Sequence, residues 1–125
     1  MKSNHTGLKR IVFAGLYSWR GLRAGWMSEA ALRQEFMLLA VGAPVALLLP
    51  LEPLEKALLL CSLLALIVVE LLNSAIEAVV DRIGSEYHPL SGQAKDMGSA
   101  AVLITILATI GLWATILIGA LARNT

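Results

Sequence analysis

Residues 70–81 read Glu70-Leu71-Leu72-Asn73-Ser74-Ala75-Ile76-Glu77-Ala78-Val79-Val80-Asp81 and follow directly on an uncharged apolar run, residues 57–69. Together the two stretches read as one membrane-spanning helix that carries three carboxylates and an amide in its second half. At about 100° per residue, Glu77 and Asp81 each lie within about 20° of the direction of Glu70. A charged side chain near the bilayer centre costs roughly 2.5–3.5 kcal/mol, so acids placed there are candidates for function.

The composition is that of a small integral membrane protein. Of the 125 residues, 58% are hydrophobic and 15% are charged, a balance that does not suit a soluble globule of this length. Six of the ten basic residues precede the first apolar run, which places the N-terminus in the cytoplasm under the positive-inside rule. Cys61 has no partner for an intrachain disulfide, and His5 and His88 lie too far apart for a Cys/His metal motif. Residues 1–33 lack the apolar core of a removable signal peptide.

The hydrophobic pattern predicts an all-α fold in a single domain over residues 1–125. Apolar residues at three- to four-residue spacing, with basic residues between them, predict an amphipathic surface helix over residues 6–28. Three membrane spans are expected over residues 31–51, 54–83 and 96–122. Pro44 should kink the first span, and Pro50-Leu51-Glu52-Pro53 should form a tight turn on the far side. A polar loop over residues 84–95 then lies in the cytoplasm with the N-terminus.

The residues alone leave three interpretations of the acidic helix face open. The carboxylates could be structural and pair with Arg82, Lys95 or the basic N-terminal helix. They could instead carry protons in a small ion-coupled transporter. They could also serve an enzyme that acts on a lipid at the bilayer surface.

Phosphoryl transfer requires carboxylates to hold Mg²⁺, cations to face the phosphates, and a base near the acceptor hydroxyl. The predicted cytoplasmic rim offers these residue types, with Glu29 at the end of the surface helix, Glu77 and Asp81 at the end of the second span, and Lys95-Asp96 before the third. Magnesium usually takes one or two protein carboxylates, so Glu29 with Glu77 would be enough. Because neither a GxxxxGK[ST] loop nor a glycine-rich kinase loop is present, a nucleotide site would need another design.

Three motifs resemble the prokaryotic integral-membrane diacylglycerol kinases. They are Glu70-x-x-Asn73-Ser74-Ala75-Ile76-Glu77-x-x-Val80-Asp81, Arg82-Ile83-Gly84-Ser85-Glu86-Tyr87-His88 and Ala94-Lys95-Asp96-Met97-Gly98-Ser99. The N-terminal stretches Tyr17-Ser18-Trp19-x-Gly21-Leu22-Arg23-Ala24 and Glu29-Ala30-Ala31 also match the family. The resemblance covers nearly the whole chain and is weak only over residues 36–60. Pro89 and Gln93 depart from the family pattern, which has a glutamate and an arginine there. The undecaprenol kinases share the same fold, but the glutamate and basic pattern here is closer to that of the diacylglycerol enzymes.

The resemblance implies a homotrimer of three-span subunits in the bacterial inner membrane, with active sites shared between neighbouring subunits. The implied reaction transfers the γ-phosphoryl group of ATP to the sn-3 hydroxyl of diacylglycerol and gives phosphatidic acid. Mg²⁺ is the implied cofactor and ATP the co-substrate. The implied partners are the lipid substrate, the membrane and further copies of the chain, with no nucleic acid.

Carried onto matching positions, the resemblance implies that Glu70 is the general base, that Asn73 lies beside it, and that Glu29 and Glu77 hold Mg²⁺. The implied ATP-binding residues are Arg10, Tyr17, Glu29, Glu77, Glu86, Tyr87, His88, Lys95 and Asp96. The implied substrate-binding residues are Arg10, Ala14, Gly15, Ser18, Trp19, Arg23, Ala24, Trp26, Ala31, Arg33, Gln34, Glu35, Lys56, Glu70, Ser99 and Trp113. Desolvation by the bilayer would make Glu70, the deepest acid, a better proton acceptor than a surface glutamate. Residue type alone favours belt or packing roles for the three tryptophans.

Overall fold

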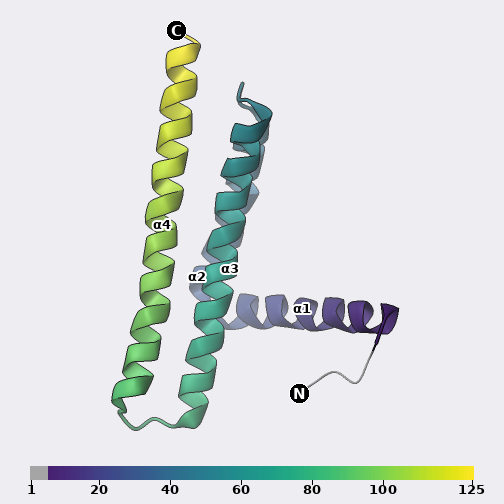
Figure 1. Ribbon diagram of the computed structural model, residues 1–125, viewed down its shortest axis with the longest axis vertical. Coiled ribbons are helices and arrows are strands. Elements are labelled where there is room, and N and C mark those ends of the chain that lie inside the picture. The colour runs from purple at the N-terminus through teal and green to yellow at the C-terminus, as the bar shows by residue number, and fades with distance from the viewer. Residues whose placement is uncertain (1–5) are drawn as a thin grey trace.

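The computed structural model describes residues 6–125, so Lys2 and His5 of the charge and metal arguments lie outside the described residues. The described part contains four helices and no strand, which confirms the all-α prediction. Its elements are α1 (Leu8–Ser28), α2 (Ala30–Leu48), α3 (Pro53–Ile83) and α4 (Pro89–Arg123). Helices α2, α3 and α4 run along the long axis of the molecule, whereas α1 runs across it (Figure 1).

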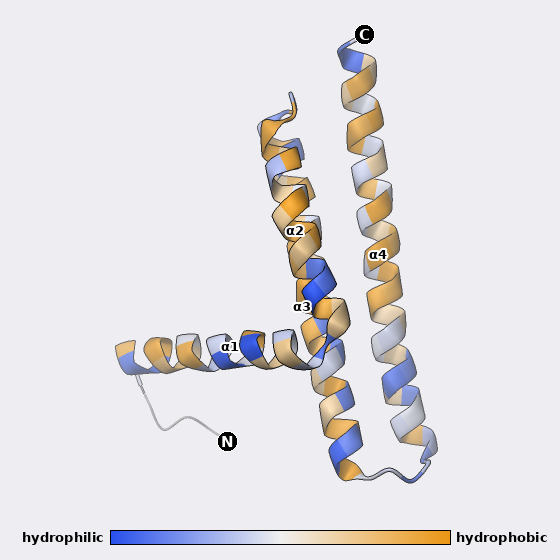
Figure 2. Cartoon of the chain, turned by 180° about the vertical axis from the view of Figure 1, so that it is seen from behind, coloured by the Kyte–Doolittle hydropathy of each residue, from blue (hydrophilic) through white to orange (hydrophobic). Residues whose placement is uncertain are grey.

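Each of α2, α3 and α4 is long and apolar enough to cross a membrane, but their lengths differ. The 19 residues of α2 span about 28 Å, whereas the 31 residues of α3 span about 46 Å, against a hydrocarbon core about 30 Å thick. The start of α2 lies beside Glu70, because Ala31 and Glu70 line one cavity. The last turns of α3 therefore extend beyond the start of α2, and Figure 2 shows hydrophilic residues there and at the start of α4.

Local sequence signals explain where the two longest helices begin. Pro53 occupies the first turn of α3, and Glu52 and Glu55 form a reciprocal capping box in front of it, with the Glu52 amide donating to Glu55 Oε1 at 3.0 Å. At α4, His88 Nδ1 accepts a hydrogen bond from the Leu90 amide at 3.1 Å, and Pro89 stands in the first turn. The prediction of a loop through residue 95 is therefore wrong, since a proline at the first helical position starts a helix instead of breaking it.

Four contacts between α3 and the antiparallel α4 fix how the two helices are aligned. In order along α3, the contacting pairs are Glu55 with Arg123 at 2.7 Å, Ser62 with Trp113 at 2.9 Å, Asn73 with Gly98, and Asp81 with Lys95 at 2.6 Å. Helix α2 joins α3 through a hydrogen bond of 2.6 Å from Lys56 Nζ to the Leu47 carbonyl. Pro44 lies inside α2 without ending it.

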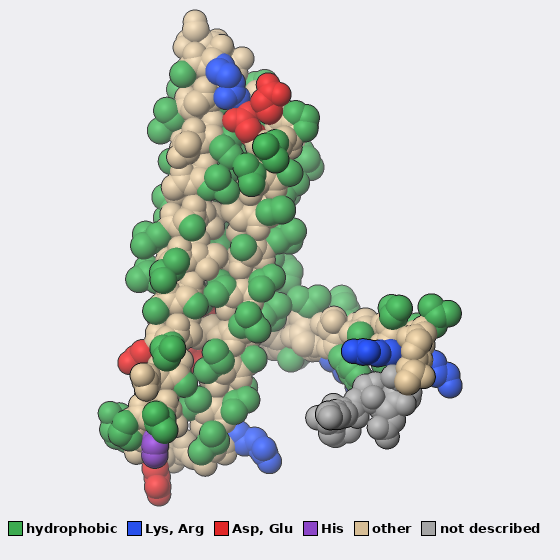
Figure 3. Space-filling model, viewed as in Figure 1, with side chains coloured by type: hydrophobic (Ala, Val, Ile, Leu, Met, Phe, Trp, Pro, Cys, Tyr) green, Lys and Arg blue, Asp and Glu red, His purple; other side chains and the backbone are tan. Residues whose placement is uncertain are grey.

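The buried core is small for a chain of this size. It is centred on Ala46, Leu59 and Ile116, one from each long helix, with Trp113 packed against it. Apolar side chains cover the length of the long helices on the face shown in Figure 3. Exposed apolar surface of this extent indicates that the helices meet lipid or further protein.

Candidate active site

Two polar side chains of α3 are buried halfway along the bundle. Glu70 is 6% exposed and Asn73 is 8% exposed. Glu70 lines a cavity of about 420 Å³ between α2, α3 and α4, and the cavity also includes the predicted lipid-binding residues Ala31, Gln34 and Glu35. The structure thus brings the predicted base next to one predicted group of substrate residues.

The rest of this cavity wall was missed by the sequence analysis. The additional lining residues are Leu38, Leu66, Val102, Ile106, Thr109 and Ile110. Because they come from three helices, only the tertiary arrangement joins them. The four-residue spacing of Val102, Ile106 and Ile110 shows that they share one face of α4, but it does not reveal what that face meets.

Two further carboxylates lie near Glu70, and we call Glu29, Glu70 and Glu77 the carboxylate cluster. Glu29 is the single extended residue between α1 and α2, and the charges of Glu29 and Glu77 both act on the Glu70 carboxylate. Over residues 6–125 the ion pairs are Asp81 with Lys95 and Glu55 with Arg123, so none includes the cluster. Like charges held near one another without a direct ion pair repel, which favours binding of a cation.

The cluster is nevertheless not a closed metal site. Within the described residues, no three His, Cys, Asp or Glu side chains converge as ligands of one ion. Mg²⁺ commonly binds to one or two carboxylates and takes its other oxygens from phosphate and water. The two half-buried glutamates, Glu29 and Glu77, fit that pattern, because each is near Glu70 and lacks an ion-pair partner among residues 6–125.

Several buried polar atoms in this region lack a partner. Asn73 Nδ2 donates to Glu77 Oε1 at 3.4 Å, but Asn73 Oδ1, Ser74 Oγ and Glu35 Oε2 are buried with no hydrogen bond. Buried polar groups in folded proteins are nearly always hydrogen-bonded, because an unpaired one costs about 1–3 kcal/mol. Of the three residues, Glu35 lines the same cavity as Glu70, so its unpaired oxygen is placed to bind a polar group of a ligand.

The end of the bundle where α3 and α4 are joined, residues 77–96, carries most of the predicted ATP-binding residues, and we call it the polar end. Glu86, Tyr87 and His88 are exposed in the connection and line a hollow of about 650 Å³. Lys95 Nζ contacts Asp81 Oδ1 at 2.6 Å, so the structural pairing considered for Asp81 is confirmed. Glu70 and Glu77, in contrast, form no ion pair among residues 6–125.

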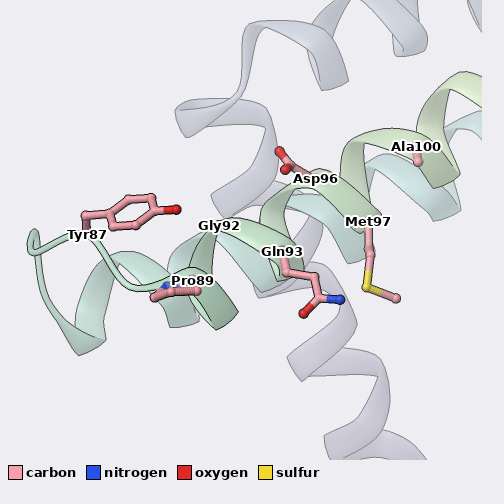
Figure 4. Close-up of a pocket in the computed structure, with 7 residues that line it drawn as sticks. All are labelled: Tyr87, Pro89, Gly92, Gln93, Asp96, Met97 and Ala100. Carbon is pink, nitrogen blue, oxygen red and sulfur yellow. The ribbon is translucent and has the colours of Figure 1, made fainter.

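A second hollow of about 640 Å³ lies along the start of α4 (Figure 4). Its lining residues are Tyr87, Pro89, Gly92, Gln93, Asp96, Met97 and Ala100. In Figure 4 the Tyr87 hydroxyl points along the helix toward Asp96, whereas Gln93 and Met97 leave the other side. The two positions that depart from the family pattern, Pro89 and Gln93, therefore lie beside two predicted ATP-binding residues.

The predicted residues of α1 fall into two groups. Trp19, Arg23 and Trp26 line an apolar hollow of about 420 Å³ together with Leu22 and Phe36. Ser18 and Ala24 line a hollow of about 540 Å³ against α3. Arg10, Ala14, Gly15 and Tyr17 are exposed on the part of α1 that leads away from the bundle. A single chain does not bring this last group to the polar end.

The corner between α1 and α2 is held by Arg33, whose Nη1 donates to the Trp26 carbonyl at 2.6 Å. Ser99 is exposed on α4, directly after Gly98.

Two predicted substrate residues lie in the other half of the bundle. Lys56 is 14 residues, about 21 Å, from Glu70 along α3, and Trp113 is 15 residues, about 22 Å, from Gly98 along α4. Their contacts are with Leu47 and Ser62, and a single chain does not bring either to Glu70.

Comparison with known proteins shows that the chain is similar to one family of enzymes. A family described as prokaryotic diacylglycerol kinase matches residues 16–117. A diacylglycerol kinase of Escherichia coli K12 is 53% identical over 117 residues, covering 94% of this chain and 96% of the relative. Diacylglycerol kinases of Pseudomonas aeruginosa PAO1 and Haemophilus influenzae Rd are 52% and 42% identical, covering 91% and 90% of this chain and 93% and 95% of the relatives. The chain therefore belongs to the prokaryotic diacylglycerol kinase family.

Proposed function

We propose that this protein transfers the γ-phosphoryl group of ATP to the sn-3 hydroxyl of diacylglycerol at the membrane surface, giving phosphatidic acid and ADP. Membership of the family makes the chain a lipid kinase. One observation carries the more detailed proposal. The buried Glu70 carboxylate lies where an apolar cavity meets the carboxylate cluster, so a lipid hydroxyl and a polyphosphate could both reach it.

Glu70 acts as the general base in this proposal. Its carboxylate takes the proton of the lipid hydroxyl while that oxygen bonds to the γ-phosphorus, and the bond from the γ-phosphorus to the bridging oxygen breaks to release ADP. Gln34 and Glu35 offer polar groups for the glycerol in the same cavity, and Leu38 and Leu66 line it with apolar surface. Asn73 lies one turn from Glu70 and donates to Glu77.

Glu29 and Glu77 are the residues that would hold Mg²⁺. When bound, the ion would neutralise phosphate charge that builds up during transfer. The chain itself contributes two half-buried carboxylates that form no ion pair among the described residues, and the Asn73 amide orients one of them. Lys95, Asp96 and residues 86–88 at the polar end would bind the nucleotide.

The functional unit in this proposal is a homotrimer in the bacterial inner membrane. Its N-terminus and the connection between α3 and α4 would lie in the cytoplasm, consistent with the basic N-terminal residues. Arg10 and Tyr17 point to shared sites, because α1 carries them away from the bundle of its own chain (Figure 1). A neighbouring subunit could then receive them at its polar end.

Transfer of labelled phosphate tests this function. Purified protein in lipid bicelles is given γ-labelled ATP, Mg²⁺, diacylglycerol and undecaprenol in competition. We expect the label to appear in phosphatidic acid in preference to undecaprenyl phosphate. Label in undecaprenyl phosphate alone would assign the other lipid alcohol, and absence of label from both lipids would contradict kinase activity.

A further inference from the structure

Helices α3 and α4 are in tight contact at Gly98, which packs against Asn73. A Cβ atom placed on Gly98 would overlap Asn73 Oδ1, and it would lie 3.3 Å from Asn73 Cγ and 3.8 Å from Ile76 Cδ1. Gly98 is itself buried. Only glycine therefore leaves room for the Asn73 side chain in its present position.

Other tight glycines in the molecule differ in what they meet. At Gly42, a Cβ would lie 2.7 Å from Leu63 Cδ1, and at Gly25 it would overlap Leu32 Cδ2. Both contacts are with the ends of leucine side chains, so an added methyl group there would disturb apolar packing and no polar group. Asn73 has a short side chain, is 8% exposed, and makes a polar contact that movement would break.

The contact with Gly98 involves one particular side of the Asn73 amide. The amide has an acceptor oxygen on one side and a donor NH₂ group on the other. With Oδ1 against the Gly98 backbone, where a Cα–H group is a weak donor, Nδ2 is directed at Glu77 Oε1 at 3.4 Å. A reversed amide would point its oxygen at the Glu77 carboxylate, and the two acceptors would repel.

We propose that Gly98 is a positioning residue for phosphoryl transfer: the absence of a side chain lets α4 hold the Asn73 amide with its NH₂ group directed at Glu77. This inference rests on the proposed function, because it gives Asn73 and Glu77 their roles. Gly98 touches neither substrate nor metal in this account. It acts through Asn73, so its effect must disappear when the Asn73 side chain is removed.

The test is a double-mutant cycle of Gly98→Ala and Asn73→Ala, with kcat and Mg²⁺-dependent ATP binding as readouts. Gly98→Ala alone should lower kcat by about 10²-fold, the scale of a misplaced active-site group, and raise the Mg²⁺ concentration needed for half-maximal ATP binding. In the Asn73→Ala background, the same substitution should change the ATP-binding midpoint by less than about twofold, because the clash is gone.

Two matched glycines separate positioning from packing. Gly111 has nothing within 4 Å of an added Cβ, so Gly111→Ala should leave both readouts unchanged. Gly42→Ala should lower thermal stability without moving the Mg²⁺ midpoint.

Three results would overturn the inference: wild-type behaviour of Gly98→Ala, an equal effect of Gly98→Ala in the Asn73→Ala background, or the same Mg²⁺ shift in Gly42→Ala. Absence of lipid phosphorylation by the wild-type protein would instead overturn the proposed function.

Discussion

Glu29, Glu70 and Glu77 bring three negative charges together, and no Lys or Arg of residues 6–125 forms an ion pair with them. Such a cluster is costly in a bilayer, and charges that are kept there despite the cost are candidates for function. The contrast with Asp81 on the same helix is informative. Asp81 pairs with Lys95 and is largely exposed, so its charge needs no ligand to explain it.

Replacement of Glu77 tests the metal-binding role. Glu77→Gln keeps an acceptor for the Asn73 amide but removes one charge, so we expect the Mg²⁺ titration of kinase activity to shift to higher concentrations, by about tenfold or more, the lower end of what loss of a metal-orienting group costs. Glu52→Gln, at the opposite end of α3, is the control and should leave the titration unchanged. If Glu77→Gln shows the wild-type Mg²⁺ requirement, Glu77 is not a ligand.

At the scale of helices, the pattern of apolar residues was sufficient to predict three long helices and a separate N-terminal helix. It misplaced the start of α4, because a polar stretch with Pro89 and Gly92 is typical of a loop, whereas His88 caps a helix that begins at Pro89. The acidic face of α3 was also predictable, since its spacing is a local property. What that face meets was not, because the cavity beside Glu70 takes walls from α2 and α4, and no local pattern encodes that arrangement.

One of the contacts that align α3 with α4 is made by Trp113, for which a role in substrate binding was predicted. The Trp113 Nε1 donates a hydrogen bond to Ser62 Oγ at 2.9 Å, and the indole packs against the buried core. The structure offers helix packing as the alternative role. A hydrogen bond of this kind inside a membrane is worth about 0.6–1.7 kcal/mol.

Substitution of tryptophans distinguishes the two roles. Trp113→Phe removes the donor, so we expect a lower midpoint of thermal inactivation in mild detergent with an unchanged KM for diacylglycerol. Trp19→Phe is the matched variant, because Trp19 lines an apolar hollow on α1 and should affect the lipid KM more than stability. A raised lipid KM in Trp113→Phe at normal stability would restore the substrate role of Trp113.

On the scale of the whole molecule, an apolar bundle adjoins a polar end, and the proposed reaction takes place where the two regions meet. The long helices expose apolar side chains (Figure 3), whereas the connection between α3 and α4 carries exposed polar groups. Glu70 lies between these regions, and α1 leaves the bundle near it, since Gly25 meets Leu71. A lipid alcohol from the membrane and a nucleotide from water can therefore meet at this level.

The role of Glu70 is the claim on which this account depends, and one comparison of wild-type protein with Glu70→Gln tests it. The turnover number is measured with saturating ATP, Mg²⁺ and diacylglycerol, after crosslinking has shown the same assembly and binding has shown the same ATP affinity. Loss of a general base should lower kcat by about 10²-fold or more while assembly and ATP binding persist. A Glu70→Gln variant that turns over at the wild-type rate would contradict the account.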